Sequence, residues 1–133
     1  MYMLDTDICI YIIKQKPKNV LDHFERLQQG DICISAITFA ELVNGAKKSQ
    51  RVEKNMARLN ELAELMVIAP FDQEAAIAYG DVRSALEKKG NIIGGNDLLI
   101  ASHALILDCI LVTNNAKEFS RVDGLKIENW VNQ

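Results

Sequence analysis

The chain has 133 residues, of which 49% are hydrophobic and 25% charged, a balance that predicts a soluble globular protein and excludes a disordered one. The net charge of −3 excludes a protein that grips nucleic acid through an overall positive charge. No apolar run approaches the roughly 20 residues of a membrane span. An apolar run opens the chain, so we expect no targeting segment, no membrane contact and a cytoplasmic location.

Short apolar runs alternate with helical stretches along the chain. The runs that predict strands are Tyr2–Leu4, Ile32–Ser35, Met66–Ala69, Cys109–Val112 and, more weakly, Leu125–Ile127. Helices are predicted over Asp7–Lys14, Asn19–Gln29, Ser35–Lys48, Gln50–Leu65, Asp72–Lys89 and Asp97–Leu107. This alternation is typical of a largely parallel sheet with helices on both faces, and no linker divides the chain.

Capping residues and glycines predict several helix ends. Gly30 is expected to end the helix that begins at Asn19, Asp72 to cap the long helix that follows it, and Gly90 to end that helix. Residues 90–97 form the one flexible stretch. It does not follow a strand and no Lys-Ser/Thr pair comes after its glycines, so we do not expect a phosphate-binding loop.

The cysteines and histidines carry no recognisable chemistry. The three cysteines lie far apart inside apolar runs without zinc-binding spacing, and we interpret them as reduced core residues. His23 and His103 have no Ser or Cys partner at a recognisable nucleophile position, which argues against a catalytic triad.

Two acids stand at the ends of predicted elements. Asp5 ends the first strand, and in open α/β sheets the ligand crevice lies at the carboxyl ends of the strands. No nearby Lys or Arg balances Asp5, so its charge calls for a cation. Asp97 begins a helix and shares a face with apolar neighbours such as Ile100 and Ala104. It is therefore either a helix cap or part of a site.

Two further places on the chain, a helix position and a turn, each have two interpretations. Glu41 lies away from the apolar stripe of its helix, so periodicity places it on a solvated face, whereas Gly45 leaves space beside it and the preceding strand should end near Asp5. Thr113 and Asn115 follow the Cys109–Val112 strand. They could hydrogen-bond a ligand or a metal-bound water, or form an ordinary turn.

Four segments taken together resemble the PIN domain: Leu4–Asp7, Ser35–Leu42, Asn96–Ala101 and Val112–Phe119. More narrowly, the chain resembles the VapC-type toxins of bacterial type II toxin–antitoxin systems from Met1 to about Trp130. The resemblance implies a single PIN domain over residues 1–133, with a three-layer α/β/α fold around a central parallel sheet of four or five strands. It also implies an endoribonuclease that depends on Mg²⁺ or Mn²⁺.

The resemblance further implies the residues of the site. Asp5, Glu41 and Asp97 would be the metal-binding acids. Asn115 takes the catalytic place where many PIN domains have a fourth acid, and it supplies one neutral oxygen and no charge. The side chains expected to orient the acids or the attacking water are Thr6, Asp7 and Thr113.

Partners also follow from the resemblance. We expect a homodimer that forms a larger hetero-oligomer with a VapB-type antitoxin, one segment of which covers the cleft. We also expect an RNA substrate, with tRNA, and within it the anticodon loop of initiator tRNA, as the target. Cleavage of this target would inhibit translation. Local basic residues would attract this RNA. They are Lys14, Lys16, Lys18, Lys47, Lys48, Arg51, Lys54, Lys88 and Lys89.

Two rival functions remain open. In the first, the fold is a catalytically impaired module that binds RNA or protein, with Asn115 marking the lost catalysis. In the second, Asp5-Thr6-Asp7 is the DxD motif of a phosphatase whose first Asp is the nucleophile. Against the phosphatase, Cys9 stands where Thr or Val is expected.

Overall fold

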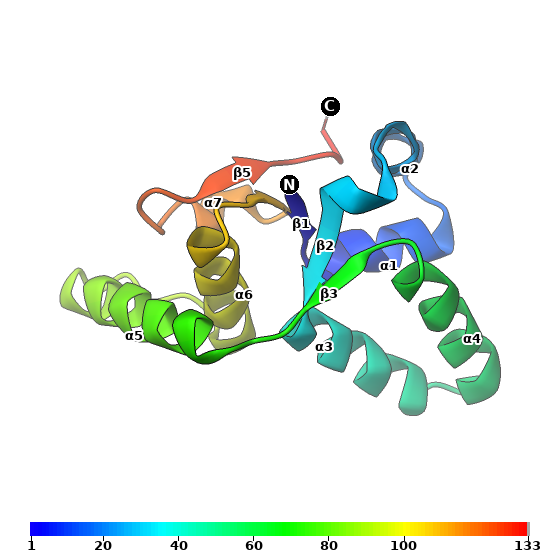
Figure 1. Cartoon of the computed structure of the whole chain (residues 1–133), viewed down its shortest axis with the longest axis horizontal. Helices are drawn as coiled ribbons and strands as arrows, with labels where there is room; N and C mark the ends of the chain where they lie inside the picture. Colours follow the sequence, from blue (N-terminus) through cyan, green and yellow to red (C-terminus); the bar gives the residue numbers. More distant parts are fainter. Residues whose placement is uncertain (133) are drawn as a thin grey trace.

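The centre of the molecule is a five-stranded parallel sheet with the strand order β3-β2-β1-β4-β5 (Figure 1). The computed structural model describes residues 1–132. The strands are β1 (Tyr2–Leu4), β2 (Ile32–Ser35), β3 (Val67–Ala69), β4 (Ile110–Val112) and β5 (Lys126–Glu128). Every strand lies within one residue of its predicted bounds, and the prediction of a parallel sheet is confirmed.

Helices connect the strands and cover both faces of the sheet. They are α1 (Thr6–Lys14), α2 (Lys18–Arg26), α3 (Ala36–Lys47), α4 (Val52–Ala63), α5 (Gln73–Lys88), α6 (Gly95–Ile106) and α7 (Ala116–Phe119), with a short 3₁₀ turn over Gln29–Asp31. The short helix α7 was not predicted. None of the helices described over residues 1–132 has the length and apolar character needed to cross a membrane.

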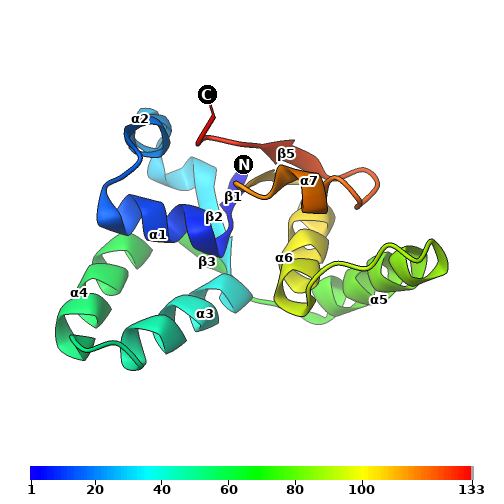
Figure 2. The same cartoon turned by 180° about the vertical axis from the view of Figure 1, so that it is seen from behind.

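Alternation of side chains along the strands sets the three layers. Met3 and Leu111 belong to the core that packs under α5 and α6, whereas Leu4 and Val112 belong to the core under α1, α2 and α4. Figure 2, seen from behind, shows α1, α3 and α4 on one side of the molecule and α5 and α6 on the other. The expected three-layer α/β/α fold is therefore confirmed.

The predicted end of α2 is wrong, whereas both ends of α5 are confirmed. The chain leaves the helix at Leu27, which is extended and packs against the core, so Gly30 falls inside the 3₁₀ turn instead of ending α2. Asp72 caps α5 by accepting the Ala75 N–H at 3.0 Å. Gly90 follows that helix with a φ of +64°, a conformation that favours glycine.

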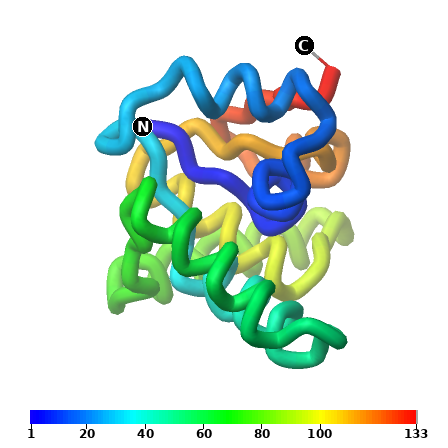
Figure 3. The backbone as a smooth tube through the Cα atoms, turned by 90° about the vertical axis from the view of Figure 1, so that its right-hand side faces the viewer, coloured from blue at the N-terminus to red at the C-terminus, as the bar shows by residue number. Residues whose placement is uncertain are grey.

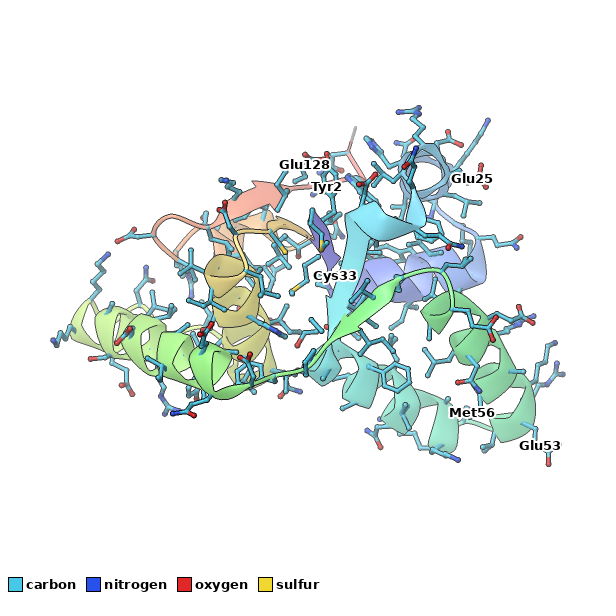
Figure 4. The ribbon with its side chains drawn as sticks, in the orientation of Figure 1. Tyr2, Glu25, Cys33, Glu53, Met56 and Glu128 are labelled. Carbon is cyan, nitrogen blue, oxygen red and sulfur yellow. The ribbon has the colours of Figure 1, made fainter. Side chains whose placement is uncertain are left out.

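The cysteines are free thiols inside the core, as predicted. Cys33 lies between the sheet and α6 (Figure 4), with its Sγ 4.0 Å from Sγ of Cys109. Cys9 packs in the core on the opposite face of the sheet.

The C-terminal segment runs beside α2 (Figure 3), and Trp130 holds it there through its contact with His23. Its indole is almost completely buried and stacks on His23 at 5.2 Å between ring centroids. Tyr2 and Glu128, both labelled in Figure 4, flank it, and Trp130 Nε1 donates a hydrogen bond to Glu128 Oε1 at 3.0 Å. Trp130 therefore connects the C-terminus to β1 and α2.

We predict that Trp130→Ala lowers the free energy of unfolding by about 3–5 kcal/mol, because it empties a buried aromatic site that the surrounding helices cannot refill. Trp130→Phe is the matched control, since it keeps most of the packing and loses only the hydrogen bond to Glu128, at about 1 kcal/mol. Urea denaturation measures both. A loss below about 1 kcal/mol for Trp130→Ala would contradict this role.

Candidate active site

Asp5 lies at the carboxyl end of the central strand. Its backbone N–H donates to the carbonyl of Val112 at 3.0 Å, which extends the pairing between β1 and β4 by one residue. Its carboxylate caps α1 by accepting the Ile8 N–H at 3.0 Å, and it also accepts a hydrogen bond from the Thr113 hydroxyl. Only 6% of Asp5 is exposed. The side chain of Asp5 is thus both the cap of α1 and part of the candidate site.

The charge of Asp5 is poorly compensated by the protein. Burial raises the pKa of Asp5 to about 6, against the hydrogen bonds from Thr113 and Ile8, which lower it. The negative charges of Asp7 and Asp97 raise it further. A buried carboxylate with these neighbours gains much from a bound cation.

Glu41 points into the site from α3. Its Oε1 accepts the Thr6 hydroxyl at 2.6 Å, and its Oε2 accepts the Asn96 side-chain amide at 3.1 Å. These two bonds join the beginnings of α1 and α6 to α3. The solvated position suggested by periodicity is therefore wrong, because neighbouring helices partly bury this side chain.

Asp97 lies in the first turn of α6 and does not cap it. The helix begins at Gly95, two residues before the predicted start, and Gly94 is its cap residue. Burial raises the pKa of Asp97 to about 6, followed by the negative charges of Glu118, Glu41 and Asp7. This repulsion shows that Asp97 lies close enough to these three acids for their negative charges to interact with its own.

Glu118 is the acid that the sequence reasoning missed. It lies on α7, where its Oε1 accepts the Gly94 N–H at 3.0 Å and its Oε2 accepts the Asn115 amide at 2.8 Å. These bonds lower the pKa of Glu118. A Cβ at Gly94 would lie 3.8 Å from both Asp97 Oδ2 and Glu118 Oε1, so the two carboxylates border the same point. The signal in the sequence was an acid three residues after Asn115, within one helical turn.

The three residues expected to orient the acids behave differently. Thr6 holds Glu41, and the buried Thr113 hydroxyl holds Asp5 while accepting the Asn115 N–H at 2.9 Å. Asp7 is exposed and acts on the site through its charge. The amide of Asn115 holds Glu118 in place.

The donor set fits a hard divalent cation. Asp5, Glu41, Asp97 and Glu118 bring carboxylate oxygens from separate elements to one edge of the sheet, and such oxygens are what Mg²⁺ and Mn²⁺ bind. Within residues 1–132, no three acid, His or Cys side chains converge closely enough to form a complete metal site. Hydrogen bonds from the protein instead hold Asp5, Glu41 and Glu118.

His103 belongs to a separate buried contact. Its Nδ1 lies 2.8 Å from Oγ of Ser35, a partner that the sequence reasoning did not anticipate. Ser35 is fully buried and caps α3 by accepting the Ile37 N–H, and burial lowers the pKa of His103. A serine without access to solvent cannot attack a substrate, so this pair joins α6 to the end of β2.

Comparisons with known proteins identify the family. The PIN domain model matches residues 2–125, and the chain belongs to this family. Ribonuclease VapC2 of Rickettsia felis is 45% identical over 131 residues, with 98% of each chain covered, and the tRNA(fMet)-specific endonuclease VapC of Shigella flexneri is 43% identical, with 97% covered. Within the PIN family, the chain thus belongs to the VapC ribonucleases.

Solved structures agree with this assignment. The VapBC2 complex of Rickettsia felis bound to a promoter DNA fragment contains a chain with a TM-score of 0.91 and 44% identity, covering 97% of this chain and 98% of that one. The DNA-bound VapBC of Salmonella typhimurium gives a TM-score of 0.91 at 40% identity, with 97% of both chains covered. The resemblance inferred from the four segments is confirmed.

We predict that Asp5→Asn stabilises the metal-free protein at pH 7. The folded pKa of about 6 lies above the ordinary value of 3.8, so Asp5 stabilises the fold below pH 4 and loses that contribution as the pH rises through 6. The loss is about 3 kcal/mol, and asparagine avoids it while still accepting both hydrogen bonds.

Denaturant unfolding in EDTA at pH 4 and pH 7 measures this effect. The variant should exceed the wild type at pH 7 and match it at pH 4. Asp81→Asn, which changes an exposed acid on α5, is the control. Equal stability of Asp5→Asn and the wild type at both pH values would contradict a strained carboxylate at Asp5.

Proposed function

We propose that the protein is a divalent-metal-dependent endoribonuclease that hydrolyses phosphodiester bonds in tRNA, and that an antitoxin controls it. The observation that carries this proposal is the group of carboxylates from Asp5, Glu41, Asp97 and Glu118 at the carboxyl edge of the sheet. Because tRNA is a cytoplasmic substrate, the proposal also locates the protein in the cytoplasm.

We assign a binding role to each acid. Asp5 and Asp97 would be the main ligands of Mg²⁺ or Mn²⁺, since burial and acidic neighbours raise the pKa of both carboxyl groups. Glu118 would complete the set beside Asp97, and it supplies the charge that Asn115 lacks. When bound, the cation would neutralise these acids, polarise the scissile phosphate and activate water.

The protein's own hydrogen bonds prepare this chemistry. Thr6 and Asn96 each occupy one oxygen of Glu41, which fixes the carboxylate and leaves its other lone pairs available. Thr113 fixes Asp5 in the same way. At pH 7 the cation would displace the remaining protons from Asp5 and Asp97, because both have a pKa of about 6.

The rival functions find less support. Asn115 suggested a catalytically impaired module, because it lacks a charge. Glu118 would supply a fourth carboxylate instead, and it is linked to Thr113 at the end of β4 through the hydrogen bonds of Asn115. A phosphatase would use Asp5 as a nucleophile, but this carboxylate is buried and engaged by Ile8 and Thr113.

An antitoxin partner is supported by the similar solved structures, which are VapBC assemblies. The chain offers a suitable surface, a cavity of about 670 Å³ between α1, α2 and α4. Its apolar lining includes Ile12, Leu21, Phe24, Leu62 and Leu65. We propose that a VapB-type segment occupies this cavity in a hetero-oligomer built on a toxin homodimer.

We predict that the wild-type protein cleaves RNA in Mg²⁺ and that EDTA abolishes the cleavage. Asp97→Asn and Glu118→Gln should each reduce the rate by at least about 100-fold, because each removes a charge that would bind the cation. Asp123→Asn is the control, since this exposed acid pairs only with Lys89 among the described residues and should keep full activity. Equal cleavage by all four proteins would place the nuclease site elsewhere.

We predict that initiator tRNA is the preferred substrate, as the name of the Shigella flexneri relative suggests for that protein. Sequencing of RNA 5′ ends after brief incubation of total RNA with the protein should find a dominant cut in the anticodon loop. Asp97→Asn, treated in parallel, provides the background. A dominant cut in messenger or ribosomal RNA would refute the substrate but leave the nuclease intact.

A further inference from the structure

Gly45 is an unusual residue for its position. It lies inside α3, four residues after Glu41, although glycine is the least favourable residue in a helix interior after proline. A Cβ at this position would meet no atom within 4 Å. Because no neighbour among the described residues requires a glycine here, its consequence is open space on the outside of the helix.

That space belongs to a cleft of about 410 Å³ between α1, α3 and α4. In Figure 2 these three helices lie together on one side of the molecule. Glu41 lines the cleft, so it opens directly beside the carboxylates of the active site. Ile13, Leu42 and Leu59 give it apolar walls. The volume is within the range that a small organic ligand occupies.

The charges around the cleft suit an anion. Lys14 and Arg58 are the cations of its lining, and Glu41 is the acid. The neighbouring cavity between α1, α2 and α4 shares both cations but also contains Glu25 and Glu61, which balance them. The lining of the cleft therefore has two cations against one acid, whereas the lining of the neighbouring cavity has two of each. A phosphate group on this side would be attracted, whereas a neutral apolar protein segment suits the balanced cavity.

Polar groups at the far end could recognise a base. The Asn55 amide donates to Ser49 Oγ at 2.9 Å, and that hydroxyl donates to the Ala46 carbonyl at 2.6 Å. This chain of hydrogen bonds fixes the orientation of Asn55 and leaves its carbonyl oxygen as an acceptor. The planar guanidinium of Arg58 can also stack on a base.

We propose that this cleft is a specificity subsite that binds one unpaired nucleotide of the RNA, adjacent to the phosphate that is cleaved. The base enters between the apolar walls, and Lys14 and Arg58 contact the backbone phosphate. A base within a duplex cannot enter such a cleft, so the subsite restricts cleavage to single-stranded loops. The inference rests on the proposed nuclease function and deepens it.

The direct test of the subsite is a variant whose new side chain fills the cleft. Gly45→Leu places a side chain in the open space, starting from a Cβ that meets no atom within 4 Å, and Gly45→Ala is the smaller step. Gly80→Leu is the matched control, because Gly80 is also inside a helix, also has no atom within 4 Å of a Cβ, and lies on α5 outside the cleft. Thermal unfolding of each variant checks that the fold is kept.

Binding is measured by fluorescence anisotropy in the Asp5→Asn background, which removes catalysis, with a labelled RNA stem-loop and a duplex of the same sequence. Gly45→Leu should raise the Kd for the stem-loop by about tenfold, the loss expected for one stacked base, and leave weak duplex binding unchanged. In the otherwise wild-type chain it should raise KM more than it lowers kcat. Gly80→Leu should match the parent protein, and calorimetry should find equal Mn²⁺ affinity for Gly45→Leu and the wild type.

The outcomes separate the two proposals. An unchanged Kd for Gly45→Leu overturns the subsite even if the wild type cleaves RNA. A raised Kd with no cleavage by the wild type supports the subsite and refutes the nuclease. If Gly45→Leu binds RNA normally but escapes inhibition by the antitoxin, the occupant is the antitoxin and the subsite fails. Weaker Mn²⁺ binding would also overturn it, because the leucine would then act on the acids.

A second variant does not depend on filling the helix face. Arg58→Ala removes an exposed cation and should weaken stem-loop binding while reducing the slope of log Kd against log salt by about 0.7, as for one phosphate contact on a single strand. Arg26→Ala, an exposed arginine at the end of α2 that does not line the cleft, should leave the slope unchanged. Equal slopes for the two variants would exclude a phosphate contact at Arg58.

Discussion

The buried negative charge of Asp5, at the end of the central strand, is the constraint around which the site is organised. Because β1 lies between β2 and β4, the helices that follow its neighbours begin close to this carboxylate. The protein stabilises Asp5 with neutral donors, the Thr113 hydroxyl and the Ile8 N–H, and these do not offset the effect of burial on its pKa. The fold thus tolerates a charge at neutral pH that a bound cation would stabilise.

The same principle extends to the other acids. Glu41 is held by a hydroxyl and an amide, and Glu118 by a backbone N–H and an amide, so uncharged groups make the hydrogen bonds to these two carboxylates. Lys14 and Arg58 lie apart from these bonds, in the cleft beyond Glu41. Spatial separation of the two charges explains how a protein with a net charge of −3 could combine a metal site with an RNA surface.

Most of the fold could be predicted because strand and helix patterns are local. The apolar run Tyr2–Leu4 predicted β1 with its observed bounds, and the caps Asp72 and Gly90 gave both ends of α5. The errors lie where tertiary contacts decide an end. Leu27 leaves α2 to reach the core, and Glu118 accepts the N–H of Gly94 at the start of α6. Neither contact has a local signature.

By itself, the sequence determined the parallel sheet and the position of Asp5 at its carboxyl edge, because strand-like runs alternate with helical stretches along the chain and Asp5 directly follows the first run. Only the tertiary structure decided that Glu41 faces the site, that Glu118 joins Asp97 beside Gly94, and that Gly45 opens a cleft. Periodicity records which face of a helix is apolar. It does not record which polar group from another element lies opposite a given side chain.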